Sequence, residues 1–181
     1  FLRGGIWKNF ITRYPESNWM HKRMLQLSQR YHALPERKKT KEMLELLYQS
    51  QANDAYWHGL FGGLYLPHLR RAIYNAIVAL EAMLDKVSAR PPMVIEDLDY
   101  DGRTEVFVHN EEIQAVVRQD GTAAVCELDA YHLKHNFGDT LARQSEHYYR
   151  KMHLDQDAQH AGEGIANPHE RVSFKHHITP A

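Results

Sequence analysis

The periodicity of the sequence changes across ARPPMVIED, residues 89–97, and this change indicates two kinds of secondary structure. Before it, apolar residues recur at steps of three and four, the spacing of an amphipathic helix. After it come short runs with strand character, separated by turns of hairpin length. A proline pair at such a change indicates a boundary or linker. The sequence therefore predicts a helical subdomain at residues 1–89 and a β domain at residues 90–181.

Three helices are expected before this boundary. The first follows Pro15, because proline suits the first turn of a helix, and it ends before Pro35. The second runs from about Glu36 to Gln51, and the third begins at Pro67. The apolar stripe of the third helix is continuous and consists of Leu69, Ile73, Ala76, Ile77, Leu80 and Leu84. Trp7 and Trp19 are expected in the core, with a position facing a cleft as the alternative for Trp7.

Four strand-like runs follow the prolines. They are MVIED (93–97), TEVFVH (104–109), IQAVVR (113–118) and AAVCEL (123–128). The turns between them contain Asp or Asn, as hairpin connections do. Four short strands in succession predict an antiparallel meander, the start of a sandwich or barrel. The expected fold class is α+β, a bundle of three main helices followed by an incomplete β domain.

Composition limits the classes of partner. Hydrophobic residues make up 43% and charged residues 25%, which are globular values. The net charge of −1 offers no basic surface field, so neither nucleic acid nor an anionic membrane is expected as a partner. No apolar run approaches the roughly 20 residues that span a bilayer. The single cysteine, Cys126, excludes an internal disulfide and fits a cytoplasmic location, although secretion cannot be judged from a chain that begins at Phe1.

The connection between the second and third expected helices is unusually aromatic. It reads QANDAYWHGLFGGLYLP, residues 51–67, and its rings are Tyr56, Trp57, Phe61 and Tyr65. Connections usually run over the surface and are polar. One explanation is that these rings pack in the core between the two helices. Three glycines favour a second explanation, because glycine leaves the backbone close to a neighbouring element or a ligand. These glycines are Gly59, Gly62 and Gly63.

Four residues of this connection form a candidate substrate-binding set: Asn53, Asp54, Trp57 and His58. An aromatic face beside a carboxylate and an imidazole suits a sugar. The apolar face of a pyranose stacks on the indole of Trp57, and its hydroxyls form hydrogen bonds with Asp54 and His58. This composition suggests carbohydrate binding and does not by itself indicate a reaction.

A second motif resembles the opening of a calcium-binding loop. Residues 97–102, DLDYDG, place Asp97, Asp99 and Asp101 at alternate positions before Gly102, as an EF-hand does. The twelfth position of that loop requires a bidentate Glu, and here it is Val108. A hairpin turn is therefore expected, with a weak structural calcium site as the alternative. No other metal or cofactor is expected, since the histidines lack a third ligand at zinc-site spacing.

Longer stretches resemble a known family. RGGIWKNFITRYPESNWMHKRML (3–25), QSQANDAYWHGLFGGLYLPHLRRAIYNAI (49–77) and EDLDYDGRTEVFVHNEEIQAVV (96–117) are similar to glycoside hydrolase family 57. Within that family they resemble the 4-α-glucanotransferases and the related α-amylases. The resemblance covers roughly residues 1–152 well and the remaining residues poorly.

The resemblance implies a retaining enzyme of three parts. A (β/α) barrel carries a Glu nucleophile and an Asp acid, a helical subdomain closes one side of the cleft, and a β-sandwich follows. The barrel is missing here, so no catalytic residue is assigned and the fragment alone is expected to be inactive. The β domain is then the truncated start of the sandwich.

The resemblance also implies roles for the aromatic connection. Asp54 and Trp57 match positions that contact the glucan near the bond being cut, and Asn53 and His58 belong to the same motif. The implied partner is an α-1,4-glucan or malto-oligosaccharide, with a transferase favoured over a hydrolase and a possible homodimer for the full-length enzyme. The alternative is a non-catalytic carbohydrate-binding module.

Overall fold

The computed structural model describes residues 6–58, 62–119, 121 and 124–145. Within these residues the helices are α1 (Trp7–Arg13), α2 (Pro15–Ala33), α3 (Lys41–Ser50) and α4 (Pro67–Val87). The strands are β1 (Met93–Glu96), β2 (Glu105–His109), β3 (Ile113–Arg118), β4 (Ala124–Ala130) and β5 (His135–Asn136). Single turns of 3-10 helix lie at Glu36–Lys38, Asn53–Ala55, Gly63–Tyr65 and Tyr131–Leu133. The described residues up to Ala142 belong to one compact unit.

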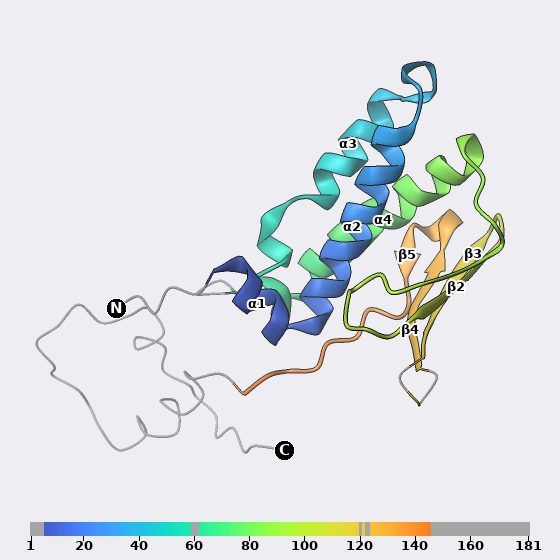
Figure 1. The fold of residues 1–181 in the computed structure, drawn as a ribbon. Coiled ribbons are helices and arrows are strands. Elements are labelled where there is room, and N and C mark those ends of the chain that lie inside the picture. The colour runs from blue at the N-terminus through green and yellow to red at the C-terminus, as the bar shows by residue number, and fades with distance from the viewer. Residues whose placement is uncertain (1–5, 59–61, 120, 122–123, 146–181) are drawn as a thin grey trace, which may run out of the picture. The chain divides into compact units, whose positions relative to one another are not determined.

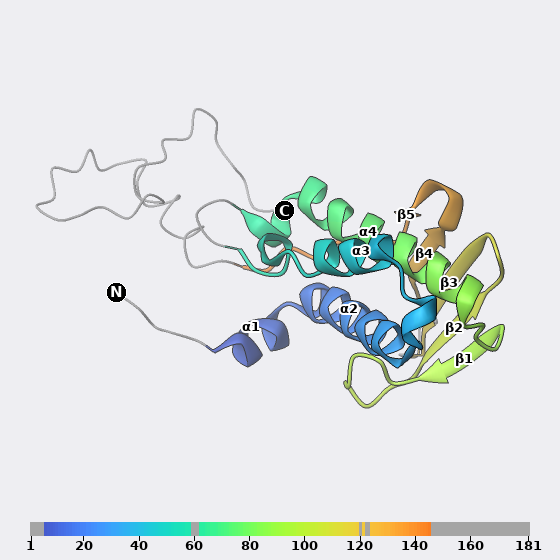
Figure 2. The ribbon, with the colours of Figure 1, turned by 90° about the horizontal axis from the view of Figure 1, so that it is seen from above.

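Helices and strands form two layers. The long helices α2, α3 and α4 lie side by side, and the sheet lies against α2 and α4 (Figure 1, Figure 2). The strands follow one another in the order β1-β2-β3-β4-β5, and every neighbouring pair is antiparallel. The predicted α+β fold class is therefore confirmed. None of the helices in the described part of the chain is long and apolar enough to cross a membrane.

The sheet carries apolar side chains on both faces, and its inner face also holds buried polar ones. Its inner face includes the fully buried Phe107 and Val116, which lie opposite each other on β2 and β3. The outer face exposes large apolar side chains, namely Met93, Ile95, Val108, Ile113, Val125 and Leu128. Antiparallel sheets with one solvated face usually alternate apolar and polar residues. An apolar outer face is instead typical of a sheet that packs on a second layer, as in a sandwich.

Ion pairs at the centre of the unit join the two layers. Arg23 of α2 is fully buried and pairs with Glu81 of α4 and, through its Nε at 2.9 Å, with Glu127 of β4. The indole of Trp19 donates to the other oxygen of Glu127 at 2.6 Å. Although burial alone would raise it, the nearby Arg23 and Arg90 charges lower the pKa of Glu81. The helices and the sheet therefore share charged contacts as well as apolar ones.

Several details differ from the sequence-based expectations. Helix α3 begins at Lys41 and not near Glu36, because the hydroxyl of Thr40 accepts a hydrogen bond from the Met43 amide and caps the helix there. Trp19 lies in the core as expected, but the expected burial of Trp7 was wrong, since 42% of its surface is exposed. Trp7 belongs to α1, which together with β5 was not anticipated.

Candidate functional site

The aromatic connection is anchored to the core by Tyr56. This side chain is buried, and its hydroxyl donates to the carbonyl of Ser50 at 2.6 Å. The hydroxyl of Ser17 on α2 donates to the carbonyl of Tyr56. Burial raises the pKa of Tyr56, so its phenol stays protonated and remains a donor. The core explanation therefore holds for Tyr56, and also for Tyr65, which is 6% exposed.

Gly63 allows the backbone at Leu64 to approach the backbone at Trp57. The amide of Leu64 donates to the carbonyl of Trp57 at 2.8 Å, across the segment 59–61. Gly63 has φ +47°, and a Cβ at this position would lie 1.9 Å from the Trp57 oxygen. Only glycine allows so close an approach. Gly59 and Phe61, which the sequence had singled out, lie outside the described residues.

The four predicted substrate-binding residues occupy one continuous segment. Asn53 and Asp54 lie in the 3-10 turn Asn53–Ala55, and both are exposed. Trp57 is 37% exposed although Tyr56 before it is buried. His58 is half-buried, and its Nε2 lies 2.6 Å from the hydroxyl of Tyr14. Three of the four side chains therefore reach the surface from a backbone that core contacts hold in place.

A cluster of rings, of which Tyr14 and Tyr65 are buried, links this segment to the exposed Trp7 of α1. The ring of His58 lies 5.0 Å from that of Tyr14, 4.9 Å from that of Tyr65 and 5.7 Å from that of Phe10, measured between centroids. Phe10 in turn stacks on Tyr14 at 4.4 Å and on the exposed Trp7 at 5.9 Å. We call Trp7, Phe10, Tyr14, His58 and Tyr65 the aromatic cluster.

The aromatic cluster adds residues of α1 that the sequence reading had missed. Trp7, Phe10 and Tyr14 are spaced by three and four residues, so a helical aromatic stripe was visible in the sequence. Such a stripe does not by itself predict a helix, because α1 is only 7 residues long and periodicity identifies longer helices better.

The chemistry of this surface is that of binding. Ring faces and a few placed polar groups are the usual lining of a small-molecule site. Within residues 51–58 and 62–67, Asp54 is the single carboxylate. Retaining glycoside hydrolysis requires two carboxyl groups about 5–5.5 Å apart. The segment can therefore hold a sugar but does not by itself supply the catalytic pair.

A cleft elsewhere in the unit is a weaker candidate. It has a volume of about 830 Å³ and lies beside the C-terminal end of α4, next to Asp85, Arg90 and Tyr131. Asp85 already accepts hydrogen bonds from Arg90 at 2.8 Å and also pairs with Arg30. Although burial alone would raise it, these arginines lower the pKa of Asp85. The charge of Asp85 is thus compensated by these arginines, so this carboxylate is already engaged within the protein.

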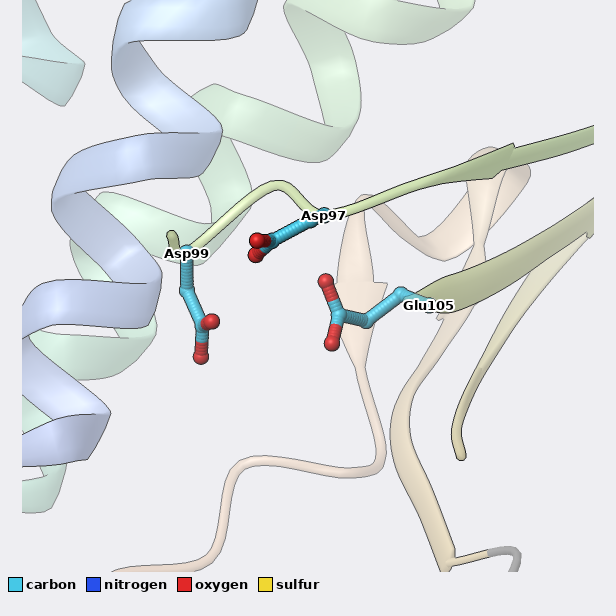
Figure 3. Close-up of side chains that lie close together, drawn as sticks. All are labelled: Asp97, Asp99 and Glu105. Carbon is cyan, nitrogen blue, oxygen red and sulfur yellow. The ribbon is translucent and has the colours of Figure 1, made fainter. Parts of the chain in front are cut away.

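The turn between β1 and β2 brings a third set of residues together. Figure 3 shows the carboxylates of Asp97, Asp99 and Glu105 grouped at this turn, and one oxygen from each lies within 4.8 Å of the others. Asp97 accepts hydrogen bonds from the amides of Asp101 at 3.1 Å and Gly102 at 3.0 Å. The predicted hairpin connection is therefore confirmed, while Glu105 was not part of the motif that the sequence suggested.

Comparison with known proteins identifies two adjoining domains. Residues 5–84 match the family described as alpha-amylase/4-alpha-glucanotransferase, middle domain, and residues 97–181 match its C-terminal counterpart. The chain belongs to the α-amylase/4-α-glucanotransferase family. This confirms the resemblance to glycoside hydrolase family 57.

Relatives within the family are far longer than this chain. A 4-alpha-glucanotransferase of Thermococcus kodakarensis is 43% identical over 94% of this chain, but the match covers 24% of that protein. An alpha-amylase of Pyrococcus furiosus is also 43% identical, and the match again covers 94% of this chain and 24% of that protein. The crystal structure of 4-alpha-glucanotransferase from Thermococcus litoralis superimposes with a TM-score of 0.70 and 41% identity, covering 83% of this chain and 22% of that one. The chain thus spans about a quarter of the length of these family members.

Proposed function

We propose that this chain forms a non-catalytic wall of the glucan-binding cleft in a retaining enzyme that acts on α-1,4-glucans, a 4-α-glucanotransferase in preference to an α-amylase. The observation that carries the proposal is the exposed indole of Trp57 on a segment fixed by buried contacts. The names of the relatives, 4-alpha-glucanotransferase and alpha-amylase, support the substrate class.

Each of the four residues has a proposed role. Trp57 stacks on the apolar face of a glucose unit, and Asn53 and Asp54 form hydrogen bonds with its hydroxyls. His58 orients the segment through Tyr14. The nucleophile and the general acid belong to the part of the enzyme outside this chain. In a retaining transfer the glycosyl group passes to one carboxylate and then to a sugar acceptor. A wall that holds the acceptor and excludes water favours transfer over hydrolysis.

Two further proposals concern the complete enzyme. We place it in the cytoplasm, in keeping with the free thiol of Cys126, and we propose a homodimer on the family resemblance alone. Cell fractionation and light scattering test these two points. We propose in addition that the middle and C-terminal domains of the family meet between Ala89 and Arg90, and that these two sequence domains pack on one core.

The test is the substitution Trp57→Ala in the complete enzyme. Truncation of an aromatic anchor typically costs about 2 kcal/mol or more of binding energy. We therefore expect kcat/KM for the disproportionation of maltotetraose to fall by about 30-fold. Tyr48→Ala is the matched control, because Tyr48 is an exposed ring on α3, 61% accessible, that the proposal gives no role. Its kinetics should equal those of the parent.

A thermal unfolding curve separates the competing explanations. Trp57 is partly exposed, so its truncation should cost less stability than the 3–5 kcal/mol, roughly, of a buried ring. Unchanged kinetics together with a large loss of stability would show that Trp57 serves only the core. If the complete protein binds maltotetraose through Trp57 but does not turn it over, it is a carbohydrate-binding module instead.

A further inference from the structure

We propose that the β1–β2 turn is a calcium-binding site with Asp97, Asp99 and Glu105 among its ligands (Figure 3). The site is separate from the aromatic segment and does not depend on the function proposed above. Calcium takes six to eight oxygen ligands, mostly carboxylates, carbonyls and waters.

The spacing of the three carboxylates suits this ion. One oxygen from each residue lies within 4.8 Å of the others. Calcium–oxygen distances are about 2.3–2.6 Å, so two ligand oxygens on opposite sides of one ion lie about 5 Å apart. Figure 3 shows the side chains coming from both ends of the turn, Asp97 and Asp99 from its first half and Glu105 from the start of β2. A single ion can therefore be reached by all three.

An independent observation points to a ligand at this place. Glu105 is fully buried, and one of its oxygens, Oε2, accepts a hydrogen bond from the Leu98 amide at 3.0 Å. The other oxygen, Oε1, is also buried and has no hydrogen-bond partner among the described residues. A buried carboxylate oxygen without a partner is costly. A cation between Glu105 and the two aspartates would remove this cost.

Among the residues that the structure describes, the recorded ion pairs do not balance the carboxylates of the turn. Within the described part of the chain, the guanidinium of Arg118 lies 3.9 Å from Asp99 and forms no ion pair with Glu105. Burial, and to a lesser degree the charge of Asp99, raise the pKa of Glu105. Burial and the charge of Asp101 likewise raise the pKa of Asp99. One arginine thus faces several carboxylates, and a divalent cation would complete the compensation.

Glu105 explains why the sequence motif seemed incomplete. An EF-hand supplies its last carboxylate from the twelfth position, which is Val108 here. In this fold the chain enters β2 directly after the turn, so Glu105 at the ninth position already faces Asp97 and Asp99. The hairpin therefore replaces the second helix of the EF-hand in delivering that ligand.

The test compares Glu105→Gln with the parent in the complete protein, after removal of bound metal with a chelator. Calorimetric titration with CaCl2 should show one equivalent fewer bound by the variant. The parent Tm should rise with calcium concentration, as expected for a ligand of the native state, and that rise should be smaller or absent in the variant. Glu111→Gln is the matched control, because it changes an exposed carboxylate in the turn between β2 and β3.

A measurement in chelator separates loss of the site from loss of the fold. A glutamine oxygen can still accept the bond from the Leu98 amide, and the substitution removes an uncompensated buried charge. Glu105→Gln should therefore be at least as stable as the parent when calcium is absent. Equal calcium stoichiometry and equal Tm responses in parent and variant would overturn the proposal. An equal response of the parent to MgCl2 would overturn the assignment to calcium.

Discussion

At the scale of single residues, Gly63 determines the shape of the aromatic segment. An added Cβ would lie 1.9 Å from the Trp57 carbonyl, so Gly63→Ala must displace that carbonyl and break its bond to the Leu64 amide. We expect a loss of more than about 2 kcal/mol in the free energy of unfolding, because the clash adds to the cost of a positive φ. Equilibrium urea unfolding measures this loss.

Gly121→Ala is the control for the backbone conformation alone. Gly121 has φ +89°, but no atom lies within 4 Å of a Cβ placed there. Its substitution should cost about 1–2 kcal/mol, the usual cost of a left-handed residue. Equal losses in the free energy of unfolding for the two variants would mean that the clash with the Trp57 carbonyl does not contribute to the cost of Gly63→Ala.

Some of the candidate site residues could be predicted from the sequence. An aromatic connection with exposed polar neighbours pointed to Trp57 and Asp54, and both reach the surface. The partner of His58 could not be inferred, because Tyr14 lies 44 residues away in the chain. Glu105 was not predicted as a calcium ligand. The EF-hand motif defines ligand positions in a loop between two helices, and those positions do not apply to a β-hairpin. Whether Asn53, Asp54, Trp57 and His58 bind sugar stays a prediction.

At the scale of elements, Arg23 fixes α2 to both α4 and β4. It is fully buried and pairs with Glu81 and Glu127. Removal of one partner from a buried ion pair typically costs about 3–5 kcal/mol, because the remaining charges stay buried and uncompensated. We expect Arg23→Met to destabilise the protein by about this amount in urea unfolding at neutral pH.

Arg30→Met is the matched control for Arg23→Met. Arg30 also lies on α2 and pairs with Glu81 and Asp85, but its side chain is 18% exposed and Asp85 keeps its bonds to Arg90. The loss in the free energy of unfolding should be clearly smaller for Arg30→Met than for Arg23→Met. If both substitutions lower the free energy of unfolding equally, burial of the ion pairs does not account for the stabilising effect of Arg23.

Periodicity predicted the long elements well and the short ones poorly. The stripe of α4 and the strands β1 to β4 lie where the sequence placed them, since each buries one regular face. Helix α1, with 7 residues, and the two-residue strand β5 are too short to show a clear period. The network around Arg23 left no signal either, because charged residues in a helix are usually solvated.

At the scale of the whole molecule, the change of periodicity at residues 89–97 separates two kinds of structure that share one core. Trp19 of α2 stacks on Phe107 of β2 with 6.2 Å between ring centroids, and both belong to the same group of buried apolar side chains. The boundary visible in the sequence reflects secondary structure, and the sequence contained no sign of how closely the two parts pack.

This shared core predicts that the helices and the sheet unfold together. Phe107→Ala removes a fully buried ring, which typically costs about 3–5 kcal/mol. Hydrogen-exchange mass spectrometry should show reduced protection in peptides of α2 and α4 as well as in the sheet, because local stability falls across a whole cooperative unit. Val125→Ala is the control, since Val125 is 57% exposed on the outer face of β4. If protection falls only in the sheet, the helical part is an independent unit, and the contacts of Trp19 and Arg23 with the sheet do not couple the two layers.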